Sequence, residues 1–497
     1  MTNELEIGLK PLWLIGVGAG IGLIIVVLFW LLLLVFNRRA ANAMLNILRE
    51  KLVFPVLLVA ALLSLFSIGM SISDVFMEGR FFDRKQEAIL STLRLPFVGE
   101  EEFSFYVEAN QKDQIFALPV PEGELRSIDL SSDQPLVVAV NEPTIEADIT
   151  TMERFTLPYS WARVRKATGP FIEQLETLHV DNDGDEGTYL VVKVVTDIII
   201  PESRAIPLTA VGLVAFVSTF LLMQWLFPKI AAVALTTGKE AVTQPLFRLT
   251  VVLGGFLILL LVFLPYFTFG DDVKMYKEAC LQIIMLLAMF MAIWTSSIAV
   301  ADEIEGRTAL TVLSKPISRQ QFVIGKYVGI ALALALLFIL LGTLFVGCVS
   351  YKVAYDARES ANSYITWMDS SVEIMRALPG LVLAFMEAAV LASIAVAIST
   401  RLPVLANLII CMGIYVVGHL LPLFVQSSVG EFAIVQFMGQ LFATVLPVLE
   451  HFNIYGAIAA GKSVPISYLL WMGGYSLILI TISMLLALVM FDDRDLT

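Results

Sequence analysis

The stretch Val328-Gly-Ile-Ala-Leu-Ala-Leu-Ala-Leu-Leu-Phe-Ile-Leu-Leu-Gly-Thr-Leu-Phe-Val-Gly-Cys-Val-Ser350 contains no charged side chain. A helix needs about 20 consecutive apolar residues to cross roughly 30 Å of hydrocarbon, so this stretch is long enough to span a bilayer. The rest of the chain has the same character, because 58% of its 497 residues are hydrophobic and only 15% are charged. The mean hydropathy is +0.83. These values predict an integral membrane protein with a mainly α, polytopic helical bundle.

Nine apolar runs of this kind occur along the chain. They lie near residues 12–36, 52–73, 206–227, 249–268, 279–300, 328–350, 378–399, 402–424 and 467–490. The first run is not typical of a cleavable signal peptide, because Glu4 and Glu6 stand where a basic region would be and the run is too long. We therefore expect it to remain as a membrane anchor.

Basic residues of the short loops predict the orientation, since they are enriched on the cytoplasmic side. An outside N-terminus places 13 of the 20 Lys and Arg residues of the spans and short loops in the cytoplasm, and leaves seven outside. We therefore expect a multi-pass protein of the cytoplasmic (inner) membrane, with the N-terminus outside and the C-terminus in the cytoplasm.

One large polar insert, residues 74–205, separates the second and third spans and is predicted to lie outside the cytoplasm. It holds 25 Asp and Glu against 12 Lys and Arg, so it accounts for the whole formal charge of −13. Such an acidic domain disfavours nucleic-acid binding. Alternating segments at 103–108, 136–140 and 189–195, separated by turn residues, predict a small, mostly β extracytoplasmic domain.

Cysteine and histidine usage argues against a metal centre. All three cysteines fall within predicted spans, and His179, His419 and His451 are isolated in the sequence, with no paired ligand spacing. The acidic segment 181–192 has Glu186 at the position where a calcium loop needs glycine, and Val192 where it needs a bidentate glutamate. We interpret this segment as a solvated hairpin turn.

A motif near the C-terminus matches the sequence pattern of a phosphate-binding loop. Gly456-Ala-Ile-Ala-Ala-Gly-Lys-Ser463 satisfies G-x-x-x-x-G-K-[ST]. A phosphate-binding loop joins a buried strand to a helix, but here no alternation of strands and helices surrounds the motif and Pro465 follows at once. We therefore expect a glycine-rich loop before the last span, and a chain that is not itself an enzyme.

The predicted cytoplasmic loop 301–327 is the most informative segment. The helix of the fifth span is expected to end before Pro316, which disfavours helical geometry in the residue before it. Ser318 and Gln321, spaced three apart, predict a capping box that starts the next helix. The result is a helix-turn-helix with a basic tip, suited to docking. On physics alone, an ordinary basic loop between two capped helix ends explains the same residues equally well.

The same loop resembles the signature of type-2 ABC transporter permeases. The resemblance lies in Glu303-Ile-Glu-Gly-Arg-Thr-Ala-Leu-Thr-Val-Leu-Ser-Lys-Pro-Ile-Ser-Arg319, followed by Phe322 and Gly325-Lys-Tyr327. Two weaker matches flank it: residues 234–248 resemble the family's amphipathic elbow helix, and Phe491-Asp-Asp-Arg-Asp-Leu496 resembles its C-terminal ending. Together these matches cover about 229–497 and enclose six spans, the number that this family uses.

The resemblance implies a permease subunit, without catalytic activity, that moves a substrate across the membrane, with export as the expected direction. A separate ATPase subunit would bind ATP and magnesium and would seat the loop in a groove. The residues that would carry this coupling are Glu303, Glu305, Gly306, Arg307, Lys315, Pro316, Ser318 and Arg319. Permeases of this family work in pairs, so a homodimer or heterodimer is implied. The family also places short re-entrant helices before the last span, where residues 432–445 show an apolar helical pattern.

Within the spans, Glu387 is the one carboxylate predicted near the middle of the membrane. A charge there costs about 2.5 to 3.5 kcal/mol or more, so Glu387 should face the bundle, be protonated or line a translocation path. A structural hydrogen bond between helices is the simpler alternative. In the first span, Gly16, Gly18, Gly20 and Gly22 provide G-x-x-x-G spacings that permit close helix contact.

The sequence thus divides into four parts: two N-terminal spans in 1–73, the acidic domain 74–205, a third span in 206–228 and a six-span core in 229–497. The three N-terminal spans and the acidic domain depart from the family's minimal form. A membrane scaffold or sensor, whose external domain binds a partner, therefore remains the alternative function.

Overall fold

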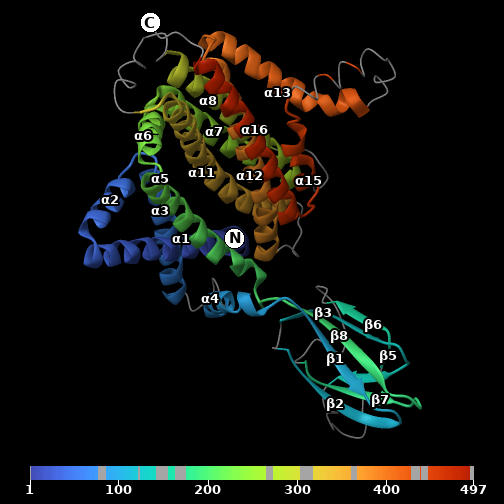
Figure 1. Ribbon diagram of the computed structural model, residues 1–497. Helices are drawn as coiled ribbons and strands as arrows, with labels where there is room; N and C mark the ends of the chain where they lie inside the picture. Colours follow the sequence, from blue (N-terminus) through green and yellow to red (C-terminus); the bar gives the residue numbers. More distant parts are fainter. Residues whose placement is uncertain are drawn as a thin grey trace. The chain divides into compact units, whose positions relative to one another are not determined.

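The computed structural model describes residues 2–76, 85–120, 124–140, 155–162, 175–264, 272–302, 317–359, 366–426, 437, 441 and 446–492 (Figure 1). The chain divides into two compact units. The helical unit comprises residues 1–78 and 208–497, and the β unit comprises residues 79–207.

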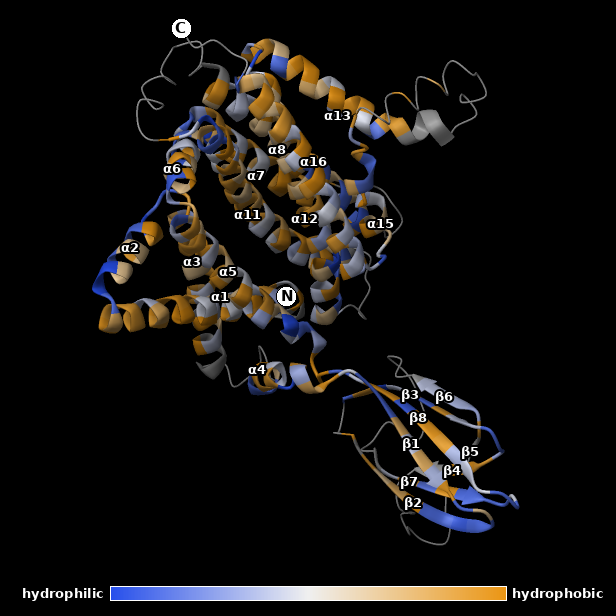
Figure 2. Cartoon of the chain, viewed as in Figure 1, coloured by the Kyte–Doolittle hydropathy of each residue, from blue (hydrophilic) through white to orange (hydrophobic). Residues whose placement is uncertain are grey.

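Nine of the described helices are long and apolar enough to cross a membrane, which confirms the nine predicted spans. They are α1 (Thr2–Phe36), α3 (Phe54–Phe76), α5 (Ala205–Leu226), α7 (Pro245–Phe263), α8 (Asp272–Ser296), α11 (Arg319–Glu359), α12 (Trp367–Ser399), α13 (Val404–Gln426) and α16 (Ile466–Asp492). Figure 2 shows their mainly apolar colouring.

Several of these helices extend well beyond their apolar runs. Helix α8 begins at Asp272, α11 continues to Glu359 and α12 begins at Trp367. The start of α12 has a capping box, in which the main-chain N–H of Thr366 donates to the Asp369 carboxylate at 2.8 Å. The added turns carry ionisable side chains. These side chains lower the local hydropathy, so the apolar run ends before the helix does.

Four shorter helices lie in the described connections between the spans of the helical unit. They are α2 (Arg38–Leu48), α6 (Pro228–Thr243), η5 (Glu450–Phe452) and α15 (Tyr455–Ala459). Asn37 caps α2 by accepting a hydrogen bond of 3.1 Å from the Ala40 N–H. Helix α2 buries Ala41, Met44 and Ile47, a spacing that places them on one side of the helix.

The first span packs through the predicted glycines. A Cβ on Gly16 would lie 2.3 Å from the Leu63 carbonyl oxygen in α3, and one on Gly20 would lie 2.6 Å from Ser64 Oγ. A Cβ on Gly22 would lie 3.1 Å from the Ala210 carbonyl oxygen in α5. These approaches need residues without side chains, so the small-residue pattern serves close helix packing as expected.

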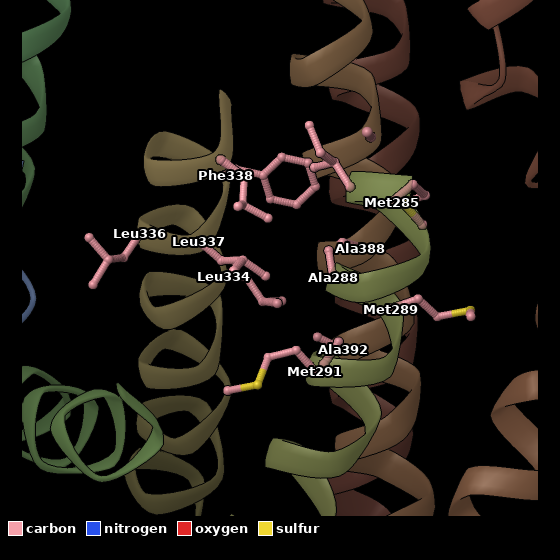
Figure 3. Close-up of a cluster of buried hydrophobic side chains, with 14 of the residues drawn as sticks. Met285, Ala288, Met289, Met291, Leu334, Leu336, Leu337, Phe338, Ala388 and Ala392 are labelled. Atoms are coloured by element: carbon pink, nitrogen blue, oxygen red, sulfur yellow. The ribbon is translucent and has the colours of Figure 1, made fainter. Parts of the chain in front are cut away.

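The core of the helical unit lies among α8, α11 and α12. Figure 3 shows methionine, leucine, phenylalanine and alanine side chains of these three helices packed against one another. Its labelled members are Met285, Ala288, Met289, Met291, Leu334, Leu336, Leu337, Phe338, Ala388 and Ala392, all of them buried. Alanine on α12 lets the larger side chains of the neighbouring helices fill the space between the backbones.

The β unit contains two antiparallel four-stranded sheets, as the alternating segments predicted. One has the order β1-β8-β3-β6 and the other β2-β7-β4-β5. The strands are β1 (Glu100–Val107), β2 (Gln111–Val120), β3 (Leu125–Ser132), β4 (Val137–Val140), β5 (Phe155–Thr156), β6 (Tyr159–Ala162), β7 (Leu175–Asn182) and β8 (Thr188–Thr196). Alternate residues of β8, including Leu190, Val192 and Val194, point into one shared apolar core. The unit also holds α4 (Lys85–Leu93), η1 (Leu95–Phe97) and η2 (Pro201–Arg204).

The segment after β7 differs from the predicted hairpin turn. Strand β7 belongs to one sheet and β8 to the other, so residues 183–187 cross between the two sheets. Asn182 holds this connection: its Oδ1 accepts from the Gly184 N–H at 2.9 Å, and its Nδ2 donates to the carbonyl oxygens of Glu108 and Glu186. The turn-forming residues were recognised correctly, but sequence does not specify which strands pair across a turn.

Candidate functional site

The candidate site is the end of the helical unit where loop 301–327 joins the bundle, which we call the loop end. Six residues of the predicted coupling set, Glu303, Glu305, Gly306, Arg307, Lys315 and Pro316, lie outside the described residues. Ser318 and Arg319 are described, and both are exposed at the start of α11. The structure therefore shows the ends of the loop and what they contact.

Ser318 starts α11 through the predicted capping box. Its Oγ accepts a hydrogen bond of 3.2 Å from the Gln321 N–H, and its own N–H donates to Gln321 Oε1 at 3.2 Å. This reciprocal pair satisfies two main-chain donors that a helix start otherwise leaves open. The loop thus returns to the bundle at a defined residue.

Arg319 and Phe322 tie the start of α11 to the end of α16. An Arg319 guanidinium nitrogen donates to the main-chain oxygen of Asp492 at 3.0 Å. The Phe322 and Phe491 rings stack with their centroids 5.9 Å apart. The described end of the family-like loop therefore contacts the described start of the family-like ending, although the two are far apart in the sequence.

Helix α6, the predicted elbow helix, packs directly against the first turns of α11. A Cβ on Gly329 would lie 2.5 Å from the Ala234 carbonyl oxygen, and one on Gly325 would lie 2.6 Å from Val233 Cβ. The elbow begins at Pro228, six residues before the matched segment, because Pro228 occupies the first turn, where no main-chain donor is needed. Lys239 of α6 pairs with Glu50, before α3, at 2.6 Å.

On the other side of the loop, α8 passes into a π-helical segment, η3 (Ser297–Asp302). Segments of this kind are frequent at functional sites. Asn407 of α13 donates to Ser297 Oγ at 2.8 Å and to the Ala395 carbonyl oxygen of α12 at 3.1 Å. Ser297, just before the loop, is therefore bonded to α13 and, through Asn407, connected to α12.

The far end of the same helices carries buried ion pairs that hydropathy did not reveal. Lys277 of α8 has no exposed side-chain surface, and its Nζ lies 2.5 Å from Glu373 Oε2 and 3.1 Å from the Ile458 carbonyl oxygen. Arg376 also contacts Glu373, at 3.1 Å. Lys352 of α11 lies 3.7 Å from Asp272. These pairs hold α8, α11 and α12 together.

Glu387 lies in α12 and is fully buried within the helical unit. Its Oε1 is 3.3 Å from His419 Nε2 in α13. His419 has no paired metal-ligand spacing in the sequence, and the packing of α12 against α13 brings it to Glu387. Sequence spacing alone could not find this pair, since the two residues lie on different helices.

The glycine-rich motif 456–463 lies on α15 and the turn after it. Gly456 belongs to the five-residue helix, and Gly461 has a φ of +75° next to Arg376. A phosphate-binding loop follows a strand, whereas here the described residues before the motif form η5 and coil. The motif therefore serves as the connection into α16.

Nine helices within the described residues are long and apolar enough to cross a membrane, so the chain is a polytopic membrane protein. Residues 259–496 match the ABC-2 family transporter protein family. No curated protein matches the sequence. The matched region contains α8, α11, α12, α13 and α16, so this part of the helical unit forms a domain similar to ABC-2 family transporter proteins.

Proposed function

We propose that this permease subunit exports a substrate across the cytoplasmic membrane, driven by ATP hydrolysis in a separate ATPase subunit. ATP and magnesium then act in that partner, and this chain catalyses no reaction. Two permease subunits, identical or related, form a dimer within the membrane. In each subunit, the N-terminus and the β unit lie outside and the loop end lies in the cytoplasm.

The observation that carries this proposal is the fastening of the loop end. The chain that leaves the loop is held at once by α16, through Arg319 and Asp492, and by α6, through Gly329 and Ala234. The chain that enters the loop is held through Ser297 and Asn407. These contacts would pass a force applied at the two ends of the loop on to α6, α13 and α16.

Charge reversal in the loop tests the proposal. The full-length protein is purified with its neighbouring gene products as wild type, Arg307→Glu, and Arg307→Glu with Arg319→Glu. Arg401→Glu, an exposed reversal in the short connection between α12 and α13, serves as the matched control. We expect an ATPase with wild type and control, and its loss from the loop variants.

If no ATPase accompanies the wild type, or if it stays with the double variant, the proposed coupling is wrong. A tight external ligand of the β unit, without any ATPase, would instead support the scaffold or sensor function.

A further inference from the structure

Three polar side chains from three elements of the helical unit interact: one pair is in close contact, and the third side chain is near enough to act electrostatically with it. They are Glu387 of α12, His419 of α13 and Tyr455, the first residue of α15. Glu387 and Tyr455 are buried, with 0% and 5% of their surfaces exposed. Burial, together with the neighbouring Glu387 charge, raises the pKa of the Tyr455 hydroxyl, so this group remains a hydrogen-bond donor.

The contacts of His419 determine where protons reside. Its Nδ1 lies 3.0 Å from the Tyr415 carbonyl oxygen, which can only accept, so Nδ1 carries a hydrogen. Its Nε2 lies 3.3 Å from Glu387 Oε1. Two acceptors without a proton would repel each other at that distance, so one proton resides on the Glu387–His419 pair. The pair is therefore neutral as a unit.

The carboxyl oxygens of Glu387 and the hydroxyl of Tyr455 can each form further hydrogen bonds. Among the described residues, neither carboxyl oxygen of Glu387 has a hydrogen bond, because the approach of His419 lacks the required alignment. The Tyr455 hydroxyl also has none. Buried carboxylates are costly unless they accept hydrogen bonds, so this arrangement suits a ligand that supplies N–H donors.

The surrounding charge favours a cation. Glu450 of η5 is close enough to act electrostatically on Glu387, and its described polar contact is the Asn453 amide, at 3.3 and 3.4 Å. The titratable groups that face the site are Tyr415 and His419 from α13, Glu450 from η5 and Tyr455 from α15. No described ion pair joins either glutamate to a lysine or arginine. One bound cation would therefore balance the Glu450 charge.

Apolar side chains pack near these polar groups. Leu449 packs against Gly418, where a Cβ would lie 2.9 Å from Leu449 Cγ. Ile458 packs against Gly380 of α12, where the corresponding distance to its Cδ1 is 2.6 Å. The buried residues Ala384 and Ala388 flank Glu387. Such surroundings favour a ligand whose charged group carries an apolar body.

We propose that Glu387, His419 and Tyr455 bind the protonated amine of an amphiphilic organic ligand. The ammonium donates to the Glu387 carboxylate and to the Tyr455 oxygen, while the shared proton stays on His419. The inference rests on the proposed export function, and it names the class of molecule that such a permease would move.

The test uses the full-length protein in lipid nanodiscs without an ATPase. Radiolabelled dodecylammonium is the probe, and binding to empty nanodiscs is subtracted. We expect saturable binding that excess dodecanol, which has the same tail without the charge, does not displace. Glu387→Gln, which keeps the side-chain shape, should weaken binding at least tenfold, and Tyr455→Phe should weaken it several-fold.

Glu278→Gln in α8 is the matched control and should bind like the wild type. Absence of saturable binding, equal binding by Glu387→Gln, or displacement by dodecanol would overturn the site. Co-purification of the ATPase is scored for each variant in a separate purification with the neighbouring gene products. Loss of amine binding with the ATPase retained refutes only the site, whereas amine binding without any ATPase refutes only the export mechanism.

Discussion

The guanidinium group of Arg319 donates a hydrogen bond to the main-chain oxygen of Asp492, 173 residues further along the chain. The same group lies 5.9 Å from the centroid of the Phe491 ring. An arginine placed at the last carbonyls of a helix also interacts favourably with the helix dipole. This contact fastens the end of the last span to the start of the helix that leaves the coupling loop.

Replacing Arg319 should affect coupling more than stability. Arg319→Ala removes a contact that is partly exposed to solvent, so we expect a loss of at most about 1 kcal/mol in unfolding free energy. Substrate-stimulated ATPase activity of the complex should fall several-fold, because α11 and α16 then move independently. Arg319→Lys should retain part of the activity. Equal activity of Arg319→Ala and wild type would show that this contact transmits nothing.

The glycine contact between α11 and α6 should be intolerant of any side chain. Gly329→Ala places a Cβ against the Ala234 carbonyl oxygen, which cannot move without displacing the helix, so we expect a loss of about 1–3 kcal/mol. Gly413→Ala in α13 meets no atom within 4 Å and should be neutral or slightly stabilising. Thermal unfolding of the detergent-solubilised protein compares the two. A Gly329→Ala variant as stable as Gly413→Ala would contradict the packing.

The buried Lys277 should be essential for the stability of the far end. Lys277→Met leaves the Glu373 carboxylate with Arg376 alone and removes the donor to the Ile458 carbonyl, so we expect a loss of about 3 kcal/mol. Lys274→Met, an exposed lysine of the same helix, provides the comparison. The readout is the midpoint of thermal unfolding. Similar midpoints for both variants would show that the pair adds no stability.

The proposed orientation can be tested with single added cysteines. The native Cys280, Cys348 and Cys411 are buried, so background labelling should be low. We expect Ser131→Cys, exposed in the β unit, to react with a membrane-impermeant maleimide in intact cells. Thr236→Cys, exposed on α6, should react only after permeabilisation. The reverse pattern would place the N-terminus in the cytoplasm.

Composition was sufficient to predict the nine spans, because crossing hydrocarbon imposes one length and one polarity on every such helix. The capping box at Ser318 was also predictable, since its two partners are three residues apart. Helix ends at Asp272 and Glu359 were not, because their charged side chains interrupt an apolar run while the helix itself continues. Helix α2 is too short to carry a membrane signal.

Contacts between helices could not be predicted from the sequence, for a different reason. Glu387 could be recognised as exceptional, but its neighbour His419 depends on the rotation of two packed helices. The same holds for Lys277 and Glu373, which are far apart in the chain. A single sequence carries helical periodicity, but it does not specify which helix faces which.

The central claim is that loop 301–327 docks on an ATPase, and site-directed photo-crosslinking in intact cells tests it most directly. A benzophenone amino acid replaces Thr311 within the loop, and a second variant carries it at Ser131 in the β unit as the control. The account predicts a crosslink from position 311 to an ATP-binding cassette ATPase, identified by mass spectrometry, and none from position 131. A crosslink to that ATPase from position 131 alone, or from neither position, would contradict it.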